Sequence, residues 1–131
     1  MIIDSSALLA ILFAEPEAAA CATAIETAVD RRISAVNFVE AAVVIDGRRD
    51  PVASGRFDDL LREASVTVEP VDEIQAAMAR HAYRVFGRGS GHPAGLNFGD
   101  CFAYALARCR GEALLFKGND FVHTDITSAL P

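Results

Sequence analysis

The chain has 131 residues, of which 52% are hydrophobic and 23% are charged, a composition that suits one globular domain and excludes a disordered chain. Its formal net charge of −6 lacks the basic excess usual in nucleic-acid-binding proteins, so any phosphate contact depends on local clusters of arginine. The cysteines Cys21, Cys101 and Cys109 are odd in number and contain no C-x-x-C pair, which argues against a disulfide framework and a cysteine zinc site.

No segment reads as a targeting or membrane sequence. The apolar run over residues 7–14 is too short to span a bilayer. Asp4 precedes it and no basic residue does, so it is a poor match to a signal peptide. We therefore expect a cytoplasmic protein, in which Cys101 and Cys109 are small core residues of an apolar helix.

The first part of the chain predicts one strand and two helices. Residues 1–3 are a short apolar run typical of a buried strand. Ser5 or Ser6 is then predicted to cap a helix that reaches Phe13. An alanine-rich helix follows over about 17–29.

The middle of the chain repeats this alternation. Residues 32–36 predict a second strand, and Asn37 is predicted to cap a helix whose apolar positions over 38–45 share one face. Another helix is expected over 51–63, with a proline near its start. Residues 66–70 predict a third strand.

The last part predicts two further helices and a fourth strand. Helices are expected over 72–85 and 99–110, separated by a glycine-rich loop that matches no phosphate-binding motif. Residues 113–116 predict a strand, and 118–120 a turn. The order of short apolar strands and amphipathic helices predicts a single α/β domain over 1–131, with a parallel sheet covered on both faces.

Four acidic residues occupy positions that packing does not explain. Asp4 directly follows the first predicted strand, and Asp120 lies in the turn after the fourth. Glu40 and Asp100 are each the only acid near the start of a strongly apolar helix. A buried carboxylate is costly unless it is paired or bound to a cation, so these positions are candidates for chemistry.

Each acid also has a purely structural explanation. Asp4 is placed to cap the helix that follows it. Glu40 has capping-box spacing from Asn37. Asp100 lies where a helix dipole favours a negative charge, and Asp120 suits a turn.

Together the four acids point to a cation site. The carboxyl ends of parallel strands meet at one edge of a sheet, so we expect these side chains near the same crevice. Unit charges about 4 Å apart repel by about 4 kcal/mol at an effective dielectric of about 20. Ligands that are all oxygen, with no histidine or cysteine among them, favour Mg²⁺ or Mn²⁺ over zinc.

The four acids lie within four segments, in order residues 1–8 (MIIDSSAL), 37–41 (NFVEA), 96–105 (LNFGDCFAYA) and 114–121 (LLFKGNDF). Together these segments resemble the motifs of PIN-domain ribonucleases, in particular the VapC toxins of bacterial toxin–antitoxin pairs. The resemblance covers nearly the whole chain. It implies a PIN-like three-layer α/β/α sandwich with a short, mainly parallel sheet of four or five strands.

The resemblance also implies which residues form the site. The family's acidic positions fall on Asp4, Glu40, Asp100 and Asp120. Asp4 and Asp100 resemble the principal metal ligands, while Ser6 and Asn119 resemble neighbours that orient water or carboxylates. Many relatives carry Thr and a further Asp where this chain has Phe116 and Gly118, so the resemblance does not extend to a full second metal site.

The implied activity is Mg²⁺-dependent hydrolysis of RNA phosphodiester bonds by an endoribonuclease, with Mn²⁺ as a substitute ion. The implied partners are the RNA, a VapB-like antitoxin, and a second copy in a homodimer or a toxin–antitoxin hetero-oligomer. The antitoxin is expected to lie across helices near Leu9, Phe13, Val39 and Val43. Arginine side chains, together with Lys117, are expected to hold the RNA backbone.

Two other functions fit parts of the sequence. A catalytically weak PIN module that binds RNA or protein would explain the altered fourth motif. A phosphoacceptor receiver domain would use Lys117 after a late strand, but it needs an aspartate at the end of the third strand, where this chain has Glu69 and Pro70.

Overall fold

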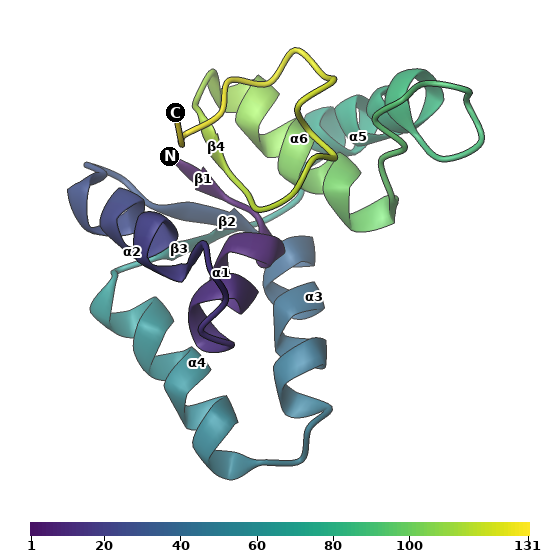
Figure 1. Ribbon diagram of the computed structural model, residues 1–131. Helices are drawn as coiled ribbons and strands as arrows, with labels where there is room; N and C mark the ends of the chain where they lie inside the picture. The colour runs from purple at the N-terminus through teal and green to yellow at the C-terminus, as the bar shows by residue number, and fades with distance from the viewer.

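The computed structural model describes residues 1–131 as a four-stranded parallel sheet with helices on both faces (Figure 1). The sheet has the order β3-β2-β1-β4, and its strands are β1 (Ile2–Ile3), β2 (Arg32–Ser34), β3 (Thr67–Glu69) and β4 (Leu114–Leu115). The helices are α1 (Ser5–Leu12), α2 (Ala18–Thr27), α3 (Ala35–Asp46), α4 (Pro51–Glu63), α5 (Glu73–Phe86) and α6 (Phe98–Arg110). The predicted α/β sandwich with a short parallel sheet is confirmed.

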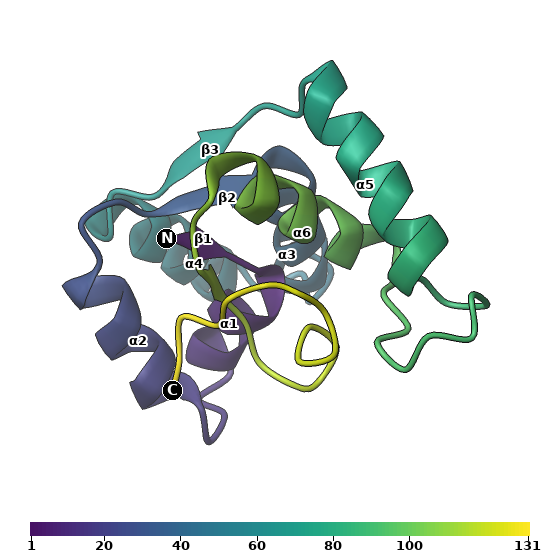
Figure 2. The ribbon, with the colours of Figure 1, turned by 90° about the horizontal axis from the view of Figure 1, so that it is seen from above.

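Alternation along the central strands divides the apolar interior into two cores. Ile2 of β1 and Leu114 of β4 belong to one core, which they share with α5 and α6. Their neighbours Ile3 and Leu115 belong to the other, which they share with α1, α2, α3 and α4. The side chains of successive strand residues point to opposite faces of the sheet. A strand of two residues therefore contributes one side chain to each core. Figure 2 shows α6 crossing above the sheet.

The starts of α1 and α3 differ from the prediction. Asp4, not Ser5 or Ser6, caps α1, because its Oδ2 accepts a hydrogen bond of 3.0 Å from the Ser6 amide. Ser34, not Asn37, caps α3, and its hydroxyl accepts a hydrogen bond of 3.3 Å from the amide of Val36. Asn37 therefore lies within the first turn of the helix, where it is fully buried.

Helix α4 packs on the core through Phe57, with the partly buried Ala53, Leu60 and Leu61 beside it. Phe57 is its only buried residue, at 2% exposure. The Phe57 ring stacks on that of Phe38 from α3, with 5.9 Å between ring centroids and an interplanar angle of 21°. The aromatic pair therefore joins the two antiparallel helices seen in the lower part of Figure 1.

Replacing Phe57 with Ala is expected to lower the free energy of unfolding by about 3–5 kcal/mol, because the substitution leaves a cavity beneath α4. Urea denaturation of the wild type and the variant measures the difference. Val52→Ala in the same helix is the matched control, because Val52 is 71% exposed, and its effect should stay within about 0.5 kcal/mol. Equal losses of unfolding free energy in the two variants would contradict the role of Phe57 as the main buried contact of α4.

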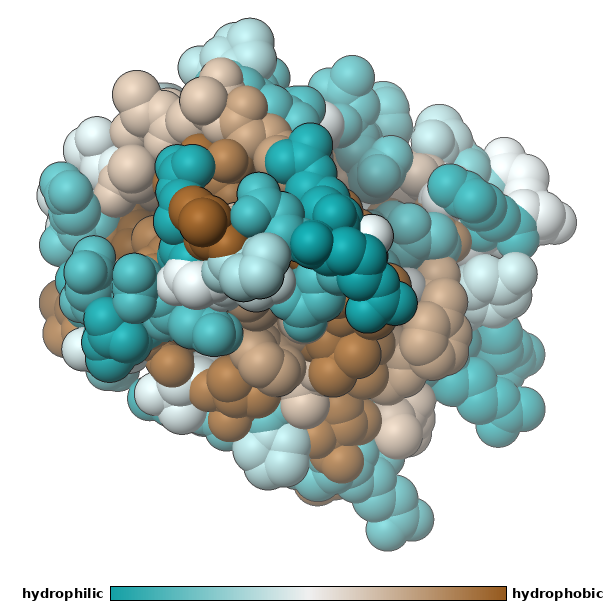
Figure 3. Space-filling view, turned by 90° about the horizontal axis from the view of Figure 1, so that it is seen from below, coloured by the Kyte–Doolittle hydropathy of each residue, from teal (hydrophilic) through white to brown (hydrophobic).

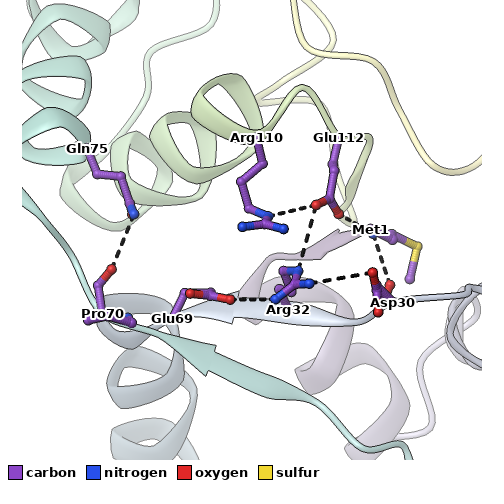
Figure 4. A network of polar contacts seen from close by, with 8 residues as sticks. All are labelled: Met1, Asp30, Arg32, Glu69, Pro70, Gln75, Arg110 and Glu112. Carbon is purple, nitrogen blue, oxygen red and sulfur yellow. Dashed lines mark hydrogen bonds and ion pairs between the residues drawn. The ribbon is translucent and has the colours of Figure 1, made fainter.

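A network of ion pairs joins the amino ends of β1, β2 and β4 to Glu69, the last residue of β3 (Figure 4). Arg32 Nη1 is 2.7 Å from Glu69 Oε1, and Arg110 Nε is 2.7 Å from Glu112 Oε1. The α-amino group of Met1 lies 2.5 Å from the other oxygen of Glu112. Acidic groups in this region are thus neutralised by cationic groups. The residue that ends β3 is a paired glutamate, not the aspartate that a receiver domain phosphorylates.

Two of the three cysteines are buried. Cys21 and Cys101 lie in the two cores, as small apolar side chains. Cys109 is exposed, so its expected place in the core is wrong. It lies in the last turn of α6 between Arg108 and Arg110, which are also exposed, where the helix has passed beyond the buried part of the sheet.

Candidate active site

Two buried aspartates lie at the carboxyl edge of the sheet. Asp4 directly follows β1 and is 3% exposed, and its amide donates a hydrogen bond of 2.9 Å to the Leu115 carbonyl of β4. Asp100 lies in the first turn of α6, which packs over β1, β2 and β4, and is 7% exposed. This is the edge where ligands gather in open parallel sheets.

Asp4 both caps a helix and keeps one oxygen free. Its Oδ2 accepts the Ser6 amide, whereas its Oδ1 is buried and has no hydrogen-bond partner. Burial raises the pKa of Asp4 to about 6, against the opposing effect of hydrogen bonds from Ser6. A buried carboxylate oxygen without a donor is unfavourable unless a cation or an ordered water approaches it.

Asp100 is held by a capping box at the start of α6. The side chain of Asn97 accepts a hydrogen bond of 2.8 Å from the Asp100 amide, and Asp100 Oδ2 accepts one of 2.9 Å from the Asn97 amide. Burial is the main cause that raises the pKa of Asp100 to about 7, and the negative charges of Asp4, Asp120 and Glu40 raise it further. The four predicted acids therefore share one region of negative potential.

Glu40 does not make the predicted capping bond to the amide of Asn37. Its Oε1 instead accepts a hydrogen bond from the hydroxyl of Ser5 and a longer one, of 3.4 Å, from the side-chain amide of Asn37. The sequence predicts neither hydrogen bond to Glu40, because Ser5 is 35 residues away and Asn37 has the spacing of a helix cap. Glu40 is partly exposed on α3.

Asp120 and Asn119 lie in the exposed turn after β4. Ser6 ties this segment to α1, since its hydroxyl accepts a hydrogen bond of 3.0 Å from the amide of Lys117. Asp120 contributes its charge to the field at Asp100. Asn119 makes no side-chain hydrogen bond, so its expected orienting role stays a prediction.

None of the four acids forms an ion pair. Lys117 is close along the chain, but its ammonium group pairs with Glu15 instead. The acids of the network around Arg32 are paired with cationic groups, whereas Asp4, Glu40, Asp100 and Asp120 have no cationic side chain paired with them. Carboxylates that lie close together without a cationic partner favour the binding of a cation from solution.

The residues fit Mg²⁺ as an open site and not as a closed cage. No group of three or more Asp, Glu, His or Cys side chains is arranged to hold a metal ion, so the expected tight convergence of all four carboxylates is not present. Mg²⁺ usually keeps several waters and binds proteins through one or two carboxylates. Asp4, with its unpartnered oxygen, and Asp100 meet that smaller requirement.

Comparisons with known proteins agree on one family. The family model described as PIN domain matches residues 1–126. The VapC ribonuclease Mb0625 of Mycobacterium bovis and ribonuclease VapC28 of Mycobacterium tuberculosis are each 58% identical to this chain over 130 residues, which cover 99% of this chain and 98% of the relative. Ribonuclease VapC42 of M. tuberculosis is 48% identical over 129 residues, or 98% of each chain.

A solved structure supports the same fold. The crystal structure of M. tuberculosis VapC20, described as a Sarcin-Ricin loop cleaving toxin, superposes with a TM-score of 0.74 over 99% of this chain and 98% of that one. The two sequences are 17% identical, so this likeness concerns the fold alone.

Proposed function

Because this chain belongs to the PIN-domain family, and within it to the VapC-type ribonucleases, we propose that it is a Mg²⁺-dependent endoribonuclease that acts as the toxin of a toxin–antitoxin pair. The proposed site consists of Asp4 and Asp100 as ion-binding carboxylates, with Glu40 and Asp120 beside them. The observation that carries the proposal is the pair of buried aspartates at the carboxyl edge of the sheet, which repel one another and have no cationic partner in the protein.

The chemistry follows from the charges of these side chains. Asp4 and Asp100 would hold a Mg²⁺ ion, which would polarise a phosphate, lower the pKa of a nearby water and offset the charge that develops on the phosphate oxygens. Glu40, whose carboxylate is kept in place by Ser5, accepts a hydrogen bond from the attacking water and so orients it. Asp120, which is exposed in the turn after β4, adds negative charge near Asp100 and so favours binding of the ion.

Exposed arginines on α5 are the best candidates for contacts with RNA phosphates. Arg80, Arg84 and Arg88 lie on α5 and in the loop after it, next to α6, and none of them forms an ion pair. Lys117, the lysine expected to join them, is paired with Glu15, so the arginines of α5 are the stronger candidates. Phosphate contacts of this kind weaken steeply with salt and carry little sequence information.

The proposed VapB-like antitoxin has an apolar groove along α3 available to it. Val39 and Val43 are 54% and 66% exposed there, and the groove is also lined by Glu40 and Phe98. Leu9 and Phe13, the other two residues expected to contact the antitoxin, are partly buried against the core that α1 shares with α2, α3 and α4.

Apolar side chains are exposed among hydrophilic ones on the face of the molecule seen from below (Figure 3). A second copy of the chain is an alternative partner for an exposed apolar surface of this kind. No helix of the protein combines the length and the hydropathy needed to cross a membrane.

Removing divalent ions is expected to abolish RNA cleavage. Purified chain incubated with total RNA should cut it in Mg²⁺, lose at least about 100-fold in rate in excess EDTA, and recover when Mn²⁺ is added in excess of the chelator. Gel electrophoresis of end-labelled RNA measures the rates. Undiminished cleavage in EDTA would contradict the ion requirement. No cleavage of diverse RNAs in either ion would favour the binding module that lacks efficient catalysis.

A further inference from the structure

Asn37 is a fully buried polar residue that caps no helix. Its side-chain amide donates a hydrogen bond of 3.0 Å to the Gly99 carbonyl of α6 and one of 3.4 Å to Glu40 Oε1, whereas its own Oδ1 has no partner. A half-satisfied buried amide is a poor choice for stability alone, because an apolar residue of similar size would avoid the orphaned oxygen. This side chain is better explained by what it holds together: α3 and the first turn of α6.

Ser5 of α1 also donates a hydrogen bond to the Glu40 carboxylate. It is the first residue of α1, it is 6% exposed, and its hydroxyl donates to Glu40 Oε1. Two donors from different parts of the chain thus converge on one oxygen atom of Glu40.

Gly99 closes the remaining side of this carboxylate. A Cβ atom at position 99 would overlap the Glu40 carboxylate, with Oε2 as the nearest atom. Gly99 is buried and has no positive φ, so backbone conformation does not demand a glycine there. The absence of a side chain at Gly99 is what lets Glu40 approach the start of α6.

The residues that hold Glu40 are chain neighbours of the two buried aspartates. Ser5 directly follows Asp4, and Gly99 directly precedes Asp100. We propose that Ser5 and Asn37 are positioning residues, which together with the space left by Gly99 fix the Glu40 carboxylate relative to Asp4 and Asp100. This inference rests on the proposed function, since it assigns these residues to the same ion-dependent site.

Three substitutions disturb this arrangement in different ways. Ser5→Ala removes one donor, and Asn37→Leu removes the other while filling the same space. Gly99→Ala keeps every donor but displaces the carboxylate. Each is expected to lower RNA cleavage, and the affinity for Mn²⁺ measured by calorimetry without RNA, by about 10- to 100-fold. This is the usual effect of losing a hydrogen-bonding partner around a metal site, here one that holds Glu40 beside the two ion-binding carboxylates.

Gly99→Ala separates positioning from folding. Alanine favours a helix more than glycine does, and the atoms that it would meet belong to the movable end of a side chain, so the variant should unfold at or above the temperature of the wild type. Lower Mn²⁺ affinity at unchanged thermal stability supports the proposal. Unchanged Mn²⁺ affinity and cleavage in folded Gly99→Ala and Ser5→Ala would overturn it.

Two controls test whether Ser5 acts through Glu40. Ser54→Ala removes the same kind of bond elsewhere, a serine hydroxyl 2.7 Å from Asp46 Oδ1, and should leave cleavage and Mn²⁺ affinity unchanged. Ser5→Thr, which keeps a hydroxyl, should retain most of the affinity. Adding Ser5→Ala to Glu40→Ala should cost no further Mn²⁺ affinity, whereas effects that multiply would overturn the assignment.

The ion-binding measurement also distinguishes this inference from the proposed function. If the wild type binds Mn²⁺ but cuts no RNA, the nuclease proposal fails, and the Mn²⁺ affinities of the variants still decide whether Ser5 and Asn37 position Glu40. A wild type that cuts RNA while all three variants match it leaves the proposed function intact and overturns this inference.

Discussion

Asp4→Asn and Asp100→Asn are each expected to lower the rate of RNA cleavage by about 10²- to 10³-fold or more, because each removes a negative charge that the bound ion needs. Asparagine has nearly the same shape as aspartate and keeps a carbonyl oxygen. It can therefore still accept the Ser6 amide at position 4 and the Asn97 amide at position 100. Single-turnover cleavage of a labelled RNA measures the effect.

The stability of the two variants separates the catalytic explanation from the capping one. If the aspartates served only as helix caps, asparagine would replace them with little change, since it is an equally good cap. We expect folded variants with wild-type melting temperatures or higher and with cleavage nearly abolished. Asp58→Asn is the matched control, because this aspartate is exposed on α4 and forms no ion pair. Wild-type cleavage by either site variant would contradict the proposed site.

The fold could be predicted from the sequence because its strands are apolar runs bounded by helices, but the exact helix starts could not. Ser34 and Asn37 are both good caps, and they lie three residues apart. The parallel pairing of Ser34 with Glu69 decides between them, since it fixes Ser34 as the last residue of β2 and makes it the cap of α3. That pairing joins residues far apart in the chain, so no local pattern reports it.

The candidate site shows the same limit. The alternatives of cap and ion ligand for Asp4 do not exclude each other, because a carboxylate has two oxygens and only one of them is used in the cap. The spacing of Asn37 and Glu40 suggested a capping box, whereas the box occurs at Asn97 and Asp100. The contacts of Glu40 with Ser5 and of Asn37 with Gly99 span 35 and 62 residues, which is why the sequence did not reveal them.

The stability of the ion-free protein is expected to fall as the pH rises from about 4 to about 7. The folded pKa values of Asp4 and Asp100 are raised from 3.8 to about 6 and about 7, mainly by burial. Between the unfolded and folded values the native state binds more protons than the unfolded state, so each step up in pH favours unfolding. Above about pH 8 both carboxylates are ionised in both states, and this contribution stays constant.

The size of this effect follows from the same shifts. One pKa unit corresponds to about 1.4 kcal/mol, so each buried aspartate destabilises the fold by on the order of 3–4 kcal/mol at neutral pH. The two contributions are not independent, because each charge raises the pKa of the other. The double variant Asp4→Asn/Asp100→Asn lacks both charges, and the difference in unfolding free energy between it and the wild type isolates their contribution from that of all other titrating groups.

Mg²⁺ or Mn²⁺ is expected to reverse this loss at pH 8 and to have little effect at pH 4.5. An ion present at about 100 times its dissociation constant stabilises the folded state by about 2.7 kcal/mol, which corresponds to roughly 10 °C in melting temperature for a chain of this length. At pH 4.5 the two aspartates are largely protonated in the folded protein and cannot bind the ion. Thermal unfolding of the wild type and the double variant, each with Mg²⁺ and with EDTA at both pH values, tests this. Equal stabilisation of the double variant at pH 8 would place the ion elsewhere, because that variant has lost both carboxylates that the site requires.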